Sequence, residues 1–365
     1  MSARLCGETM PYDKQSFLAG VAAGRNMESW PAFTSSDVDI FMFTVRANQV
    51  INYEAEFWGI IYWGDGQTTE CMTPNQSRYQ MFHAYPAEYT GQLVQVTMIG
   101  LFYGINFRYN QAATDNSLIS IDTPFPKYPS KNVNGYPITG DVSPYIYYNW
   151  FSGCTTLESI PNNLFKAYAS DSRVFFTSVA GMFSGCTSLK SVPMGLLKDL
   201  RITGTYCDGF FSGCESLESI PSDIIQGREF TIFNYFCENC TALKEIPSGL
   251  FSGFSQASEF REAFEGCTSL KSIPADLFDG CSSASDFYRT FRDCSGLTSI
   301  PSNLFHGIPS DQEYLSFEET FYRCTSVTSS VPELWVTHSQ AYSYTRCFYQ
   351  CFRAANYSDI PTYWK

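Results

Sequence analysis

EGCTSLKSIPADLF, residues 265–278, is the stretch that decides the fold of this chain, because it recurs. Close copies are SGCTTLESIPNNLF at 152–165, SGCTSLKSVPMGLL at 184–197 and SGCESLESIPSDII at 212–225. The cysteine returns at spacings of 32, 28, 26, 27, 27 and 30 residues. A sustained period near 27 predicts a solenoid in which each copy forms one turn. The cysteine column is Cys154, Cys186, Cys214, Cys240, Cys267, Cys294 and Cys324.

Other positions keep register with this cysteine. Phenylalanine stands three residues before it in six copies, with Cys237 as the exception, and Leu or Val stands three residues after it. In the first six copies Ile or Val follows at the sixth position and proline at the seventh. The seventh copy slips by one at Pro332, and a degraded unit around Phe348 and Cys351 is interpreted as a terminal cap. The constant apolar positions are therefore expected in the core.

The repeated cysteine could serve in metal binding, in disulfides or in packing. Equivalent residues of stacked turns lie about 4.8 Å apart and point the same way. A disulfide needs facing Cβ atoms at about 3.8 Å, and zinc needs four converging ligands. We therefore expect buried free thiols that act as small apolar groups with a weak donor. The pairs Cys237–Cys240 and Cys347–Cys351 are explained by the repeat. Disulfides are left open for Cys207, Cys281 and the pair Cys347/Cys351.

Residues 34–105 predict a small antiparallel β-sandwich. The runs DIFMFTVRA, EAEFWGIIYWG and QLVQVTMIG are rich in β-branched and aromatic residues with partial alternation. Between the last two, Gly64-Asp65-Gly66 predicts a tight turn.

YWGDGQ at 62–67, followed by His83-Ala84-Tyr85 and QLVQVTMIG, resembles the polycystic-kidney-disease (PKD) type of immunoglobulin-like domain. The resemblance covers about a fifth of the chain and implies structural roles for the motif. Trp63 would pack inward, Gly64 and Gly66 would supply the turn, and Asp65 would accept hydrogen bonds from turn amides. A calcium site that joins Asp65 to Asp37 or Asp39 is the less favoured alternative, because no dense acidic loop accompanies them.

The repeat F-x-x-C-T-S-L-x-x-I-P resembles the cysteine-bearing, BspA-like leucine-rich repeats of bacterial surface proteins and related gut-phage proteins, over about 200 residues. This resemblance implies adhesion or partner binding, without catalysis. The expected fold is mainly β: a PKD-like, immunoglobulin-like β-sandwich followed by a leucine-rich-repeat solenoid. The expected units are an N-terminal anchor segment at 1–33, the sandwich at 34–105, a proline-rich connector or solenoid cap at 106–149, and the solenoid with its C-terminal cap at 150–365.

Charge and composition disfavour several kinds of partner. The net charge is −13, and no cluster of Lys and Arg is present that could release counterions from phosphates. Nucleic acid and anionic membranes are therefore not expected as partners. No apolar run reaches the length of a membrane span. The short apolar patch at 17–23 has no positively charged segment before it, so a secretory signal peptide is not favoured.

Catalysis and cofactors are not expected. The three histidines are His83, His306 and His338, and none has an evident Ser or Cys partner. Motifs for nucleotide binding, zinc proteases and serine hydrolases are missing. A hydrolase of surface glycans would need a catalytic pair of acids that the sequence does not reveal. Carboxylate pairs such as Glu318-Glu319 lie in the variable segments and are interpreted as solvated.

The segments between copies vary, and in repeat proteins variable segments on one face often bind partners. Aromatic and arginine side chains dominate binding hot spots. Phe230 is expected in a second core column instead. The candidate partner-binding residues are Tyr168, Arg173, Tyr235, Arg261, Tyr288, Arg289 and Tyr314.

The expected function is non-enzymatic recognition or structural support. The N-terminal string PYDKQSFLAGVAAGR resembles leaders of phage structural proteins. It favours a virion component, such as a tail, fibre or capsid-decorating protein, that contacts other virion proteins or a host-surface protein or glycan. The alternatives are a secreted BspA-like adhesin at the bacterial surface and, less favoured, a glycan hydrolase. Homo-oligomerisation, the ligand and the binding face are left open.

Overall fold

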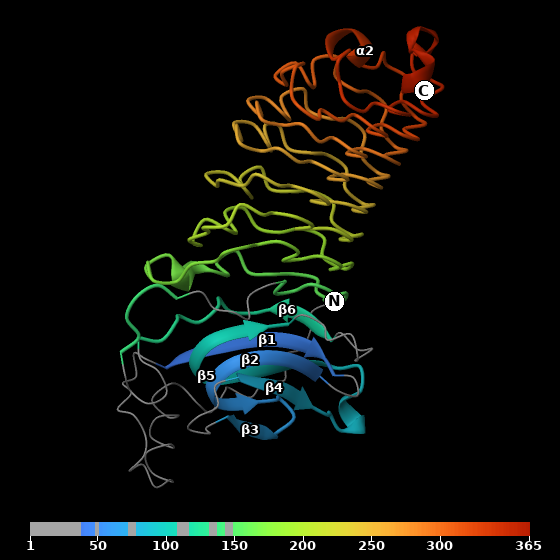
Figure 1. Ribbon diagram of the computed structural model, residues 1–365. Helices are drawn as coiled ribbons and strands as arrows, with labels where there is room; N and C mark the ends of the chain where they lie inside the picture. The colour runs from blue at the N-terminus through green and yellow to red at the C-terminus, as the bar shows by residue number, and fades with distance from the viewer. Residues whose placement is uncertain (1–37, 48–50, 72–77, 108–116, 131–136, 143–148) are drawn as a thin grey trace.

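The computed structural model describes residues 38–47, 51–71, 78–107, 117–130, 137–142 and 149–365. The described chain is mainly β, with few helices, and falls into an antiparallel sheet followed by a long stack of turns (Figure 1). The predicted anchor at 1–33 lies outside the described residues. No helix in the described ranges is long and apolar enough to cross a membrane.

Six strands form the sheet. Its order is β3-β2-β5-β1-β6, and β4 pairs with β2 beside this path. Every pairing is antiparallel. The strands are β1 (Asp39–Arg46), β2 (Ile51–Tyr62), β3 (Thr68–Cys71), β4 (Arg78–His83), β5 (Leu93–Asn106) and β6 (Leu118–Ile121), with a 3-10 turn, η2 (Ala87–Tyr89), before β5.

The sheet differs from the sequence prediction in two ways. The sequence predicted two packed sheets, but the described strands share one, because the 14-residue β5 pairs with both β1 and β2. In addition, β6 belongs to the sheet although it lies in the predicted connector at 106–149. Its four residues are too few to produce a clear strand pattern.

The W-G-D-G and H-x-Y residues meet at the end of β2. The Trp63 and His83 rings stack with centroids 4.5 Å apart, and the Tyr85 hydroxyl donates to the Trp63 carbonyl at 2.9 Å. The carboxylate of Asp65 lies 2.7 Å from His83 Nε2 and accepts a hydrogen bond from the Gln67 amide at 3.0 Å. These contacts join the turn after β2 to the end of β4.

The repeats stack one on the next, as their period predicted. We number the turns 1 to 8 by their column cysteines, with Cys351 in turn 8. In turns 5 to 8 the rings of Phe264, Phe291, Phe321 and Phe348 lie nearly parallel, with successive centroids 5.6, 5.5 and 5.5 Å apart. Backbone amides bond to the following turn, as in Phe291 N–H to Thr320 O at 2.9 Å. The degraded unit at Phe348 therefore continues the stack.

The segments that vary between copies are not loops throughout. They contain a column of parallel bridges that runs through Ile232, Glu259, Asp286, Ser316 and Ser343. They also contain a second stacked column, Phe233, Phe260, Phe287 and Phe317, with successive centroids 5.5, 5.6 and 5.5 Å apart. Phe230 is buried, as expected. These segments therefore contribute residues to the core.

Both ends of the stack are covered. At the N-terminal end the Phe107 amide donates to the Trp150 carbonyl, and its ring stacks on Phe151 at 6.0 Å. At the C-terminal end Trp364 packs on Tyr344 at 4.6 Å. The short helices of the repeat region are η4 (Lys166–Tyr168), α2 (Leu334–Thr337), η5 (Tyr357–Asp359) and η6 (Thr362–Trp364).

All column cysteines are buried and free, and so are Cys207, Cys281 and Cys347. From Cys186 onward each column thiol donates to a backbone carbonyl of the preceding turn, as in Cys294 Sγ to Phe264 O at 3.1 Å, whereas the Cys154 thiol donates to the Phe107 carbonyl next to β5. Burial raises the pKa of the Cys267 and Cys294 thiols above the ordinary value. The column cysteines are thus buried, free thiols that donate hydrogen bonds inside the stack.

Replacing Cys267 with alanine should lower the free energy of unfolding by about 1–2 kcal/mol, because the change leaves a small cavity in a close-packed column. Urea unfolding of the whole chain measures this. Because the thiol is free, a reductant or a chelator should leave the melting temperature of the unaltered chain unchanged. A large drop with either reagent would contradict the packing role.

Candidate interaction face

Two positions of every turn have the left-handed backbone conformation, with φ between 54° and 77°. They lie five residues and one residue before the column cysteine. The first column is Asn149, Gly181, Gly209, Tyr235, Glu262, Arg289, Glu319 and Arg346. The second is Gly153, Gly185, Gly213, Asn239, Gly266, Asp293, Arg323 and Gln350. Glycine takes this conformation freely, whereas other residues are strained there by about 1–2 kcal/mol.

At the first of these positions turns 4 to 8 have aromatic or charged side chains, where turns 2 and 3 have glycine; at the second position Gly266 of turn 5 remains a glycine. We call the surface built from these two columns and the residues beside them the interaction face. Strained non-glycine residues persist where the surrounding structure holds them, and they often mark functional sites. The interaction face is therefore the leading candidate for function.

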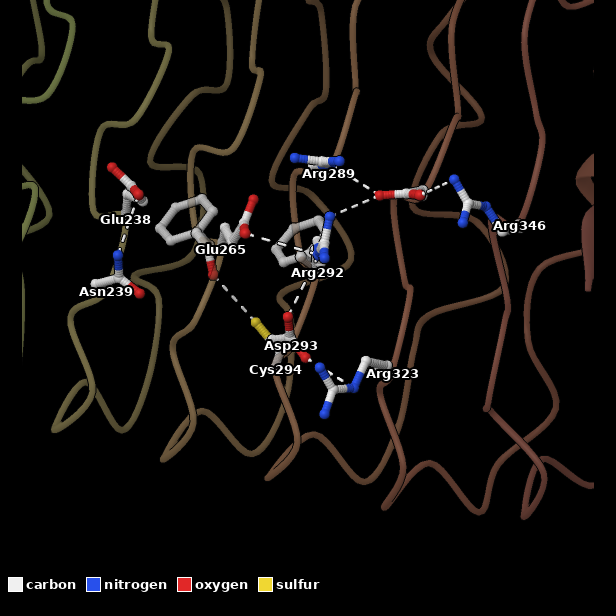
Figure 2. Close-up of polar contacts among 12 residues, drawn as sticks. Glu238, Asn239, Glu265, Arg289, Arg292, Asp293, Cys294, Arg323 and Arg346 are labelled. Carbon is white, nitrogen blue, oxygen red and sulfur yellow. Dashed lines mark hydrogen bonds and ion pairs between the residues drawn. The ribbon is translucent and has the colours of Figure 1, made fainter.

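A buried carboxylate organises the C-terminal part of this face. Glu319, whose side chain is 3% exposed, accepts from Arg289 Nε at 2.8 Å and from Arg292 Nη1 at 2.7 Å through Oε2. Its other oxygen, Oε1, lies 2.5 Å from Arg346 Nη2. Three guanidiniums from turns 6 and 8 thus converge on one carboxylate of turn 7 (Figure 2).

Further ion pairs and rings join this cluster. Arg292 Nε lies 3.3 Å from Asp293 and 3.7 Å from Glu265, and Arg323 Nε lies 3.3 Å from Asp293 (Figure 2). The guanidiniums also lie over tyrosine rings. Those of Arg261 and Arg289 lie 4.8 and 4.6 Å from the Tyr288 centroid, and those of Arg292 and Arg346 lie 4.8 and 5.7 Å from the Tyr322 centroid. Tyr349 stacks on Tyr322 at 4.8 Å.

Turns 3 to 5 contribute an acidic part to the face. Burial, reinforced by the neighbouring Glu262 charge, raises the pKa of Glu265 to about 7. One oxygen of this carboxyl, Oε2, is buried and has no hydrogen-bond partner among the described residues. Burial likewise raises the pKa of Asp208 to about 6 and raises that of Glu262.

The Glu265 carboxyl should make stability fall as pH rises from about 4.5 to about 7. Its pKa is raised from 4.5 to about 7, so in this interval the folded chain keeps a proton that the unfolded chain has released. Glu265→Gln should flatten this part of the curve, as measured by urea unfolding across the interval. Glu313→Gln, at an exposed position, is the control and should leave the curve unchanged. An unaltered slope in Glu265→Gln would contradict the assignment.

The structure brings four of the seven predicted binding residues together on this face. They are Tyr235, Arg261, Tyr288 and Arg289; the ring of Tyr288 lies near both arginines, and the Tyr235 amide donates to the Arg261 carbonyl at 2.8 Å. Tyr314 is 64% exposed, and its ring contacts Tyr342 of the next turn with centroids 5.6 Å apart.

The other two predicted residues lie elsewhere. Tyr168 is buried against Phe176, so its expected exposure on a loop is wrong: a short 3-10 helix, η4, turns the ring into the core. Arg173 is held by Asp171 at 2.7 Å and donates to the Ile138 carbonyl at 2.9 Å, which indicates a structural role.

Sequence reasoning missed Arg292, Tyr322, Arg323 and Arg346, and its interpretation of Glu319 as part of a solvated pair is wrong, because Glu319 is buried. For Glu319, Arg323 and Arg346 a signal was present, because a comparison of the copies shows where glycine gives way to large polar residues one and five positions before the cysteine. The left-handed backbone conformation at these positions, which would favour glycine, is visible only in the structure.

Two of the histidines, His83 and His338, make structural contacts. Within the described ranges no group of three or more His, Cys, Asp or Glu residues is arranged to hold a metal ion. His338 is buried, lies 3.1 Å from the Ile308 carbonyl through Nε2, and has a pKa lowered by burial. His83 belongs to the structural motif with Trp63 and Asp65.

No protein-family model matches the chain, and no curated protein matches it. Among solved structures, the crystal structure of the T. pallidum leucine-rich repeat protein is similar to it, with 19% identity and a TM-score of 0.26. That similarity covers 57% of this chain and 78% of the other.

Proposed function

We propose that this chain is a non-enzymatic recognition protein that binds its partner through the interaction face of turns 4 to 8. The observation that carries the proposal is the replacement of glycine by Tyr235, Glu262, Arg289, Glu319 and Arg346 at left-handed positions. Glycine would be the more stable choice for the backbone there, so a benefit from the side chains must outweigh the strain.

In this proposal the stacked turns are a leucine-rich-repeat solenoid of the cysteine-bearing, BspA-like kind. The sheet is a PKD-like module, in which Trp63, Asp65, His83 and Tyr85 contact one another. Repeat stacks keep core positions constant and vary one face for binding. The Phe and Cys columns are nearly constant from turn to turn, whereas the residues at the two left-handed positions change. This pattern fits a constant core and a variable binding face.

We further propose that the protein is a phage virion component, such as a tail, fibre or capsid-decorating protein. Its partners would be other virion proteins or a host-surface protein or glycan. The support is the resemblance of the N-terminal string at 11–25, which lies outside the described residues, and of the repeats.

Two measurements test these proposals. Mass spectrometry should find the chain in density-purified particles; its appearance only in the secreted or cell-surface fraction would favour an adhesin.

The purified chain, added in excess, should compete with phage particles for adsorption to host cells. The variant Arg261→Ala/Tyr288→Ala should compete poorly, whereas Lys244→Ala, which removes an exposed cation outside the interaction face, should compete fully. Turnover of a glycan that Glu265→Gln abolishes would instead establish an enzyme.

A further inference from the structure

The arginines around Glu319 are positioned by a group that a ligand cannot reach. Glu319 is 3% exposed, whereas Arg289 and Arg346 are 30% and 49% exposed. The carboxylate therefore lies beneath these two guanidiniums and sets their orientation. Arg323, which is 53% exposed, is held instead by Asp293, which is 33% exposed. A charged group held by a buried partner is preorganised, so little side-chain freedom is lost when it binds.

Much of the hydrogen-bonding capacity of these arginines is unused. Arg289 and Arg323 contact Glu319 and Asp293 through Nε, and within the described chain their terminal Nη groups have no protein acceptor. Arg346 contacts Glu319 through Nη2 alone. A guanidinium has five N–H donors in a planar fork that matches the two oxygens of a carboxylate.

The arginines lie among carboxylates of the same face. Arg289, Arg292, Arg323 and Arg346 contribute four positive charges, and their ion-pair partners Glu319 and Asp293 contribute two negative ones. Glu265 lies 3.7 Å from Arg292, and Glu262 interacts electrostatically with Arg289 and Arg292. The exposed guanidiniums of Arg323 and Arg346 belong to turns 7 and 8, whereas these two carboxylates belong to turn 5.

An exposed aromatic pair lies on the same two turns. Tyr314 of turn 7 and Tyr342 of turn 8 are 64% and 75% exposed, with ring centroids 5.6 Å apart. They precede Glu319 and Arg346 by five and four residues in the same segments. The negative face of an aromatic ring attracts positively polarised C–H groups, such as those on one side of a pyranose ring.

We propose that this part of the interaction face binds an acidic glycan, with sugar carboxylates on Arg289, Arg323 and Arg346 and a sugar ring against Tyr314 or Tyr342. This proposal rests on the recognition function proposed above and names its ligand class. The combination favours a glycan over an acidic peptide, because guanidiniums alone would suffice for carboxylates, while the exposed tyrosines suit a sugar surface.

Calorimetric titration of the full chain with galacturonic acid oligomers tests this. We expect binding to the acidic oligomers and none to neutral galactose oligomers of equal length. Arg323→Gln/Arg346→Gln should weaken binding at least about tenfold, which is the effect of one charge-assisted hydrogen bond. The control Arg353→Gln removes an exposed arginine outside the cluster and should bind as the unaltered chain does. Arg323→Lys/Arg346→Lys keeps the charge without the fork and should bind with intermediate affinity.

Three outcomes would overturn the proposal. They are equal affinity for neutral and acidic oligomers, unchanged affinity in Arg323→Gln/Arg346→Gln with circular dichroism showing a folded chain, and equal affinity for poly-glutamate that Tyr342→Ala does not alter. If acidic oligomers do not bind while the chain still competes with particle adsorption, the recognition function stands and the ligand class is wrong.

Discussion

Replacing Phe291 with alanine should lower the free energy of unfolding by about 4 kcal/mol, within the range of about 3–5 kcal/mol for buried phenylalanine. Its ring is fully buried and stacks on Phe264 at 5.6 Å and on Phe321 at 5.5 Å. The cavity would be bounded on both sides by turns whose backbones are tied together by hydrogen bonds. The neighbouring rings therefore cannot close the gap, and the full effect should persist.

Urea unfolding of the whole chain, followed by circular dichroism, measures this effect. Phe352→Ala is the matched control, because Phe352 is 64% exposed in the last turn and its loss should change stability by at most about 0.5 kcal/mol. A loss below about 2 kcal/mol in Phe291→Ala would mean that the stack can collapse around a missing ring.

Replacing Glu319 with alanine should lower the free energy of unfolding by about 3 kcal/mol. Removal of one partner of a buried ion pair is strongly destabilising, by about 3–5 kcal/mol, because it leaves the other charge uncompensated. We expect the lower end because the arginines that remain are 22% to 49% exposed and keep part of their hydration. The relief of backbone strain at this left-handed position is small, since alanine also has a Cβ.

Three variants separate charge from shape at this position. Glu319→Gln keeps the size and two hydrogen-bonding atoms but loses the charge, so it should be intermediate. Glu319→Gly removes the strain as well as the carboxylate and should be less destabilising than Glu319→Ala. Glu313→Ala, at an exposed site, should be nearly neutral. Equal stability of Glu319→Ala and Glu313→Ala would show that the arginine network contributes nothing to folding.

The stack was predictable because each copy must place identical residues in an identical environment. Cys267, Leu270 and Ile273 touch the same residue types one turn before and one turn after, so register in the sequence becomes register in space. The free, buried thiols followed from the same geometry, since side chains that point the same way cannot form disulfides.

The sheet and the interaction face were less accessible, for different physical reasons. In β5 the residues from Val96 to Asn106 are buried without a break, so alternation could not tell one sheet from two. The interaction face depends on a backbone conformation at Arg289 and Glu319 that amide contacts between turns impose. Neither residue type favours that conformation, so a single copy of the repeat contains no sign of it.

The junction at Phe107 determines how the two parts can move. The Phe107 carbonyl accepts from the Cys154 thiol at 3.3 Å, as a phenylalanine of the stack does for the next turn, and Ser120 of β6 bridges in parallel to Ser159. The sheet thus takes the place of a preceding turn, and its core is continuous with that of the stack. Because these contacts join the described parts of the sheet and the stack, a chain attached by its sheet would present the arginine cluster in a defined direction. The distance of the cluster from the attachment surface would grow by about 4.8 Å with every added turn. Because successive repeats are slightly rotated, gain or loss of whole repeats would also change the direction in which the cluster points.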